Sequence, residues 1–198
     1  MSNRQKSIDA ARKKLASHLK ADPGLDDLLL RYDRWAGDIY DGLAAVYPVD
    51  EVMTKIVDVI ANIFTARSHE LRTRDQERIL QPDWFQSPDA VGYVAYADLF
   101  AGDLNGVRKK IDYLQELGIT YLHLMPLLTP RPSPNDGGYA VMDYRTIRSD
   151  LGSMKDLSKL ASELHQSGIS LTLDLVLNHV AKEHEWAMKA KAGEKKYR

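Results

Sequence analysis

The residues best suited to chemistry lie in the run Asp174–His179, where a carboxylate, an amide and an imidazole follow one another at the end of an apolar stretch. Leucines at alternate positions from Leu171 to Leu177 predict a β-strand whose other face becomes polar towards its C-terminal end. In a parallel barrel, active sites are built at that end of the strands. The run therefore predicts a polar binding site, unless His179 only closes the strand with structural hydrogen bonds.

A second group of candidates surrounds two consecutive glycines in Asp136-Gly137-Gly138-Tyr139. Glycines beside an Asp indicate a tight turn, because Gly adopts positive φ at no steric cost and Asp caps locally. The same turn can hold a carboxylate and an aromatic face against a sugar, which offers hydroxyl groups and an apolar C–H face. Both interpretations stay open: Asp136 is a turn cap or a ligand-binding carboxylate, and Tyr139 is a core aromatic or a stacking platform.

Short apolar runs that alternate with amphipathic helices after residue 80 must position these side chains. Glu116–Thr120 is echoed by Gln166–Ser170, and in each run a glycine ends a helix before an apolar strand. Repeated strand, helix, strand units imply parallel pairing with right-handed crossovers. Periodicity predicts strands at 91–96, 120–125 and 171–177, with helices at 104–117 (Asp103 as N-cap) and 153–167.

The first 80 residues contain turn signals and helical periodicity but no strand signal. Asp22-Pro23-Gly24 and Tyr47-Pro48 are breakers, and a longer helix is predicted from residue 50 to about residue 80. Between the breakers we predict a helix at 25–40 with four apolar side chains on one face, namely Leu28, Leu29, Tyr32 and Trp35.

Composition excludes several classes of function. The chain has 198 residues, of which 44% are hydrophobic and 28% charged, so it is expected to fold around a core. A formal net charge of -1 offers no basic footprint for nucleic acid. The absence of cysteine excludes disulfides, thiolate zinc sites and a cysteine nucleophile. No signal peptide or membrane-spanning run is evident, so we expect a cytoplasmic protein with no membrane partner.

Five motifs in order resemble the amylosucrase branch of the α-amylase superfamily. They cover residues 80 to 190, and the helical region before them is similar to the helical extension of amylosucrases. The motifs are Ala97–Leu104, Glu116–Leu127, Asp136–Val141, Asp174–His179 and His184-Glu185-Trp186.

The resemblance implies an α/β fold that begins with a helical N-terminal domain over residues 1–80. Residues 81–177 would be the first three β/α units of an incomplete (β/α)8 TIM-type barrel, and residues 178–198 the start of the loop or subdomain after the third strand. The chain would then be an N-terminal fragment. Three parallel strands cannot close a barrel, so we expect an exposed leucine-bearing edge that promotes association, or disorder near residues 180–198.

The reaction implied by the resemblance is glucosyl transfer from sucrose onto an α-glucan, with hydrolysis as a side path. Asp136 would lie at the base of the glucose subsite, Tyr139 would stack on the ring, and His179 would bind a hydroxyl group. Asp174 would orient its neighbours. Asn178 matches a position that binds calcium in many α-amylases, but amylosucrase-like members do without the ion, so no metal and no cofactor are expected.

A retaining enzyme needs a nucleophile and an acid/base about 5 to 5.5 Å apart. In this superfamily those carboxyl groups follow the fourth and fifth strands, beyond residue 198. The resemblance therefore implies that this chain holds no catalytic residue and is inactive alone. A sucrose hydrolase or an α-glucosidase is an alternative parent, and a non-catalytic glucan-binding or interaction protein is a further alternative.

Overall fold

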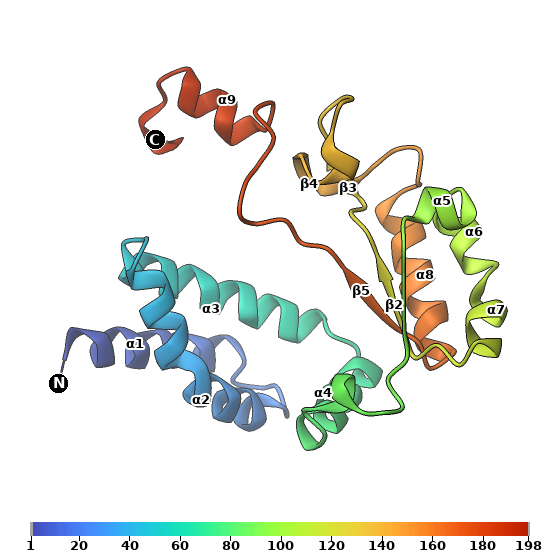
Figure 1. Cartoon of the computed structure of the whole chain (residues 1–198). Helices are drawn as coiled ribbons and strands as arrows, with labels where there is room; N and C mark the ends of the chain where they lie inside the picture. The colour runs from blue at the N-terminus through green and yellow to red at the C-terminus, as the bar shows by residue number, and fades with distance from the viewer. Residues whose placement is uncertain (1, 198) are drawn as a thin grey trace. The chain divides into compact units, whose positions relative to one another are not determined.

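The computed structural model describes residues 2–197 and divides into two units, Met1–Pro82 and Asp83–Arg198 (Figure 1). In the described part of the first unit the elements are helices alone. Their bounds are α1 (Asn3–His18), α2 (Leu25–Ala44), α3 (Val49–Ala66) and α4 (His69–Leu80).

The core of the helical unit lies between α1, α2 and α3. Leu15, Met53 and Val57 are fully buried there, and the Tyr32 hydroxyl donates a 3.1 Å hydrogen bond to the carbonyl of Ile8. Burying such apolar side chains is the main favourable contribution to the stability of these helices, which would be marginal in isolation.

The structure corrects two predictions for this unit. The single helix predicted from 50 to 80 is two helices, because Arg67 is extended and the Ser68 hydroxyl caps α4 by accepting from the amide of Leu71 at 3.3 Å. Trp35 does not share the buried face of α2, since it is 51% exposed. Ala36 takes that place beside Leu28, Leu29 and Tyr32.

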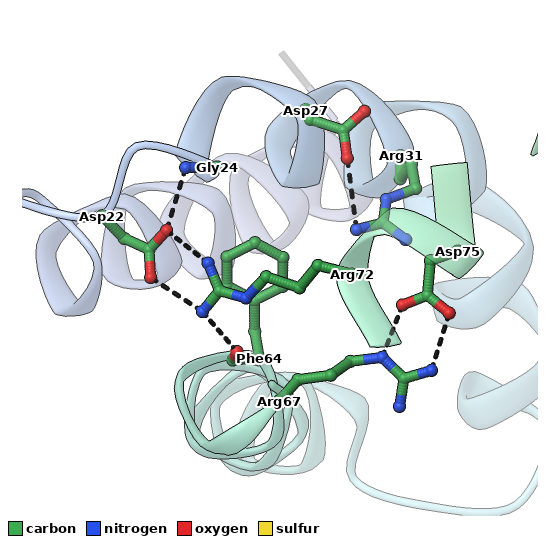
Figure 2. Close-up of polar contacts among 8 residues, drawn as sticks. All are labelled: Asp22, Gly24, Asp27, Arg31, Phe64, Arg67, Arg72 and Asp75. Atoms are coloured by element: carbon green, nitrogen blue, oxygen red, sulfur yellow. Dashed lines mark hydrogen bonds and ion pairs between the residues drawn. The ribbon is translucent and has the colours of Figure 1, made fainter. Parts of the chain in front are cut away.

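Arg72 ties three parts of the helical unit together (Figure 2). Its guanidinium forms two hydrogen bonds to the carboxylate of Asp22, at 2.8 and 3.0 Å, and a third to the Phe64 carbonyl at 2.7 Å. It also lies 4.2 Å from the centre of the Phe64 ring. Asp22 precedes α2 and Phe64 is near the end of α3, so one side chain of α4 fastens both.

The second unit contains a parallel sheet with strand order β1-β2-β5. Its strands are β1 (Gly92–Ala95), β2 (Tyr121–Leu124) and β5 (Ser170–Leu173). Tyr93 pairs with Leu122, and Leu122 pairs with Leu171. The chain between β2 and β5 forms a separate antiparallel hairpin of β3 (Leu128–Pro130) and β4 (Val141–Ile147).

Helices cover one side of the parallel sheet (Figure 1). Leu122 and Leu124 of β2 are fully buried in a core with Leu114, Leu160 and Leu164 from the helices. The helical segments of this unit are α5 (Ala97–Ala101), α6 (Leu104–Arg108), α7 (Ile111–Glu116), α8 (Met154–Gln166) and α9 (Glu185–Lys191), with the 3-10 turns η1 (Trp84–Gln86), η2 (Asp136–Gly138) and η3 (Lys195–Tyr197).

The predicted start of the first crossover helix is confirmed, because the Asp103 carboxylate accepts a 2.6 Å hydrogen bond from the Gly106 amide. The helix itself is not continuous over 104–117. It is interrupted at residues 109–110 between α6 and α7, and Leu117, at the end of the predicted range, is 48% exposed.

The third predicted strand is shorter than the alternation of leucines indicated. Its ladder with β2 ends at Leu173 rather than at Leu177. β5 is an edge strand, and the leucines beyond its end are open to solvent, with Leu175 64% and Leu177 74% exposed. Without a further strand to pair with, the alternating pattern is not enough to extend the strand. The β3–β4 hairpin was not predicted at all.

None of the helices in residues 2–197 combines the length and apolar character needed to span a bilayer.

We predict that Arg72→Lys lowers the melting temperature of the 198-residue chain by several degrees and speeds amide exchange in α4. Lysine keeps the charge but loses the two-pronged contact with Asp22. The Arg72 hydrogen bond lowers the pKa of Asp22, so this stabilisation is present above the ordinary Asp pKa and is lost as the pH falls. The matched control is Arg12→Lys, whose pair with Asp33 also has two hydrogen bonds, made by Nε and Nη2, but is more exposed. Equal losses of melting temperature in the two variants would contradict the special contribution of the Arg72–Asp22 contact.

We also predict that the 198-residue chain associates through its β5 edge and the exposed leucines that follow it. Sedimentation velocity should show oligomers for the natural sequence and a shift to monomer for the double variant Leu175→Lys/Leu177→Lys, since lysine blocks edge pairing. The control places lysines at Leu30 and Leu99, two leucines that are also exposed but lie on helices. A monodisperse monomer for the natural sequence would overturn this expectation.

Candidate functional site

An open pocket of about 360 Å³ lies at the C-terminal end of β5. All five side chains singled out from the sequence line it together, although the β3–β4 connection and the segment after β5 are far apart in the chain. The lining consists of Asp136, Tyr139, Asp174, Leu175, Val176, Asn178 and His179. Their roles with a ligand stay predictions.

Asp174 is the best connected of these side chains. One carboxylate oxygen lies 2.8 Å from Nε2 of His123 on β2, and the other accepts a 2.6 Å hydrogen bond from the hydroxyl of Tyr139. The parallel pairing of His123 with Thr172 brings the ends of β2 and β5 side by side, which places the imidazole within reach. Asp174 therefore joins the sheet to the turn that follows η2.

The hydrogen bonds at Asp174 set the charge states in the pocket. Burial acts to raise the pKa of Asp174, but the hydrogen bonds from Tyr139 and His123 outweigh it, and the pKa lies below its ordinary value. The same hydrogen bond to Asp174, aided by burial, raises the pKa of Tyr139 to about 12. At neutral pH Asp174 is thus an anion and the Tyr139 hydroxyl is its donor.

The turn at Asp136 requires glycine for the reason that the sequence indicated. Asp136, Gly137 and Gly138 have positive φ of 56°, 65° and 95° in succession. A Cβ on Gly137 would lie 2.8 Å from the hydroxyl of Tyr96, so a side chain there would be both strained and crowded. Asp is among the residues that tolerate this conformation, and strained backbone of this kind often occurs at binding sites.

Three polar side chains of the pocket remain available to a ligand. Across residues 2–197, the side chains of Asp136, Asn178 and His179 form no hydrogen bond, and all three are exposed. The turn-cap alternative for the Asp136 side chain therefore finds no contact in the structure. A carboxylate, an amide and an imidazole beside an aromatic ring are suited to bind the hydroxyl groups of a ligand.

Sequence reasoning assigned no role in the pocket to three residues that organise it, although His184 belongs to one of the motifs. His123 pairs with Asp174, the Tyr144 hydroxyl donates to the Val176 carbonyl at 2.5 Å, and His184 is only 5% exposed. The signal for His123 was its position near the end of a strand parallel to the one before Asp174. Tyr144 follows the Asp136 motif closely in the sequence, but its contact could not be foreseen, because its partner is a backbone carbonyl.

No group of three or more His, Asp or Glu side chains is arranged to hold a metal ion in the described part of the chain. Asn178, the position compared with a calcium ligand, lines the pocket together with two carboxylates, those of Asp136 and Asp174, and neither belongs to such a group. The expectation of a site without metal or cofactor stays a prediction.

Comparisons with known proteins converge on one family. A family model of the α-amylase catalytic domain matches residues 56–198. The chain is 40% identical to palatinase of Erwinia rhapontici, over 55% of this chain and 20% of that relative. It is 42% identical to oligo-1,6-glucosidase of Bacillus cereus, over 49% of this chain and 17% of that relative. A solved mutant of MutB in complex with its substrate sucrose is 31% identical, with a TM-score of 0.51 over 57% of this chain and 22% of that chain. The chain spans about a fifth of the length of these curated relatives.

We predict that Asp174→Asn returns the pKa of Tyr139 from about 12 towards 10, because the amide keeps the shape but removes the anion that holds the phenol proton. NMR titration of the tyrosine ring carbons measures this, with Tyr139→Phe to assign the signal. In the natural chain, the stabilisation from the raised pKa is present below pH 10 and lost as the pH rises through about 12. Asp143→Asn is the matched control, since Asp143 bonds to Thr146 and the Arg145 amide instead. An unchanged Tyr139 pKa in Asp174→Asn would refute the hydrogen bond.

Proposed function

The chain belongs to the α-amylase family, and from this membership we propose that its pocket binds the glucosyl unit of an α-glucoside. The observation that carries the proposal is the gathering of Asp136, Tyr139, Asp174, Asn178 and His179 around one open cavity. A sugar presents hydroxyl groups to polar side chains and a C–H face to an aromatic ring, and this lining offers both.

Each side chain has a distinct part in the proposal. The carboxylate of Asp136 and the imidazole of His179 accept or donate hydrogen bonds to sugar hydroxyl groups, and the ring of Tyr139 stacks on the sugar. Asp174 does not bind the sugar directly but fixes Tyr139 through the 2.6 Å hydrogen bond. The exposed amide of Asn178 is a further hydrogen-bonding group in the same pocket.

The whole protein, in this proposal, is a hydrolase or isomerase of α-glucosides. The names of its relatives favour this over the amylosucrase assignment, because they include an oligo-1,6-glucosidase, a palatinase and a mutant enzyme with sucrose bound as its substrate. The three parallel strands β1, β2 and β5 would be the first three of an eight-stranded barrel, and the β3–β4 hairpin part of the loop after the second strand.

The bond-breaking carboxyl groups are proposed to lie outside these 198 residues. A retaining mechanism needs one carboxylate free to attack and one carboxylic acid able to donate its proton. Asp174 has both oxygens occupied and a lowered pKa, so it suits neither role. The chain alone is therefore expected to bind a sugar and to leave its glycosidic bond intact.

Glucosyl transfer from sucrose to an α-glucan, as in amylosucrases, is the second candidate. It is favoured by His184-Glu185-Trp186, which matches that branch and forms a packed group: the Trp186 amide donates to Nδ1 of His184 at 3.1 Å, and the two rings meet edge to face. The helical unit before residue 56, which the family match does not cover, also resembles the extension found in amylosucrases.

Product analysis of a version extended into a complete catalytic domain, beside the 198-residue chain, tests the function. Both are incubated with sucrose and with an α-1,6-linked glucose disaccharide. Hydrolysis releases glucose and fructose from sucrose in equal amounts, isomerisation gives a different disaccharide, and transfer releases fructose with little glucose while a glucan grows. We expect hydrolysis or isomerisation by the extended protein, loss of activity by about a hundredfold or more in His179→Ala, and no turnover by the short chain.

The control is His165→Ala, a histidine near the end of α8 that does not line the pocket. Turnover by the short chain would mean that the catalytic carboxyl groups lie within these 198 residues, contrary to the proposal. An extended protein that binds α-glucan but cleaves no substrate would favour the non-catalytic binding alternative.

A further inference from the structure

The segment that carries Asn178 and His179 has little to hold it in place. The ladder of β5 ends at Leu173, and Leu175 and Leu177 are exposed, so neither strand pairing nor leucine burial fixes the segment. Val176 is its buried side chain, at 7% exposure. A polar site on such a segment needs further contacts, because binding geometry is lost when the supporting residues are free to move.

Those contacts come from β4 of the hairpin. The hydroxyl of Tyr144 donates to the Val176 carbonyl at 2.5 Å and lies 3.2 Å from the carbonyl of His179. A hydroxyl group has one proton, so it bonds one carbonyl at a time, and the shorter contact to Val176 is the principal one. The amide of Ala181 donates to the Val141 carbonyl at 2.8 Å, which fastens the far end of the segment to the same strand.

Tyr144 is itself held firmly. Its ring packs edge to face on the buried ring of His184, with centroids 5.6 Å apart. Burial raises the pKa of Tyr144, which keeps its hydroxyl protonated and able to donate. Tyr144 does not line the pocket, so any effect that it has on a ligand must pass through the segment that it holds.

We infer that Tyr144 is a positioning residue, which holds the backbone from Val176 to His179 so that the His179 imidazole meets a sugar hydroxyl group. The ligand in this inference rests on the proposed function, whereas the positioning of the backbone does not. Tyr144 would thus set the affinity of the pocket without touching the sugar.

Tyr144→Phe tests the inference, since it deletes the hydroxyl and keeps the ring on His184. In the ligand-free 198-residue chain we expect shifted imidazole NMR signals for His179 and faster amide exchange at residues 177–180. Affinity for glucose, measured by NMR titration, should fall by about tenfold, as expected for one lost hydrogen bond. The matched control is Tyr113→Phe, on α7, whose hydroxyl forms no hydrogen bond within residues 2–197.

A second variant reaches the same contact from the other side. Replacing the Leu177 amide by an ester weakens the Val176 carbonyl as an acceptor and leaves Tyr144 intact. The Leu177 amide donates to no backbone carbonyl in the described chain, so its loss has no other expected effect. The ester variant tests the positioning role if Tyr144→Phe does not fold. It should show the same shifted His179 imidazole signals and faster amide exchange.

The two readouts separate the two claims. If the natural chain fails to bind glucose, the proposed function fails, and the His179 signals and amide exchange alone decide the positioning claim. If Tyr144→Phe and the ester both leave those signals and exchange rates unchanged, Tyr144 does not position the segment.

Discussion

The pocket depends on a single partly buried carboxylate, that of Asp174, and on the need to satisfy both of its oxygens. A charge removed from water is costly unless it is paired and hydrogen-bonded. His123 supplies one partner from β2, and Tyr139 supplies the other from the turn after η2. Because each partner belongs to a different element, satisfying this one anion also fixes where the turn lies relative to the end of the sheet.

Non-local pairing then determines what the pocket contains. Asp174 lies 51 residues from His123 and 35 residues from Tyr139, so both contacts depend on the tertiary fold rather than on local sequence. The turn contributes Asp136 and Tyr139, and the segment after β5 contributes Asn178 and His179. The hairpin strand β4 closes the arrangement by binding the backbone of that segment through Tyr144.

Periodicity in the sequence predicted the elements better than their ends or their partners. The three parallel strands and the Asp103 cap follow from local patterns, and so does the turn at Gly137, where a side chain would be strained by the positive φ and crowded by Tyr96. The break at Ser68 and the early end of β5 depend on capping and on a neighbouring strand, which periodicity does not report. His123 could be found only by placing two distant strands side by side.

The two aspartates of the pocket show how the surroundings of a side chain, rather than its type, limit what it can do. Each oxygen of Asp174 already has a hydrogen-bond partner within the protein, and these contacts stabilise its negative charge. Asp136 sits on a turn of positive φ, exposed and without a side-chain hydrogen bond to residues 2–197, so its lone pairs can accept from a sugar. The Asp174 carboxylate holds the pocket together, and the Asp136 carboxylate lines it with no side-chain hydrogen bond to residues 2–197. In the proposed function, a pocket arranged in this way binds the glucosyl unit, and bond cleavage falls to carboxyl groups outside these 198 residues.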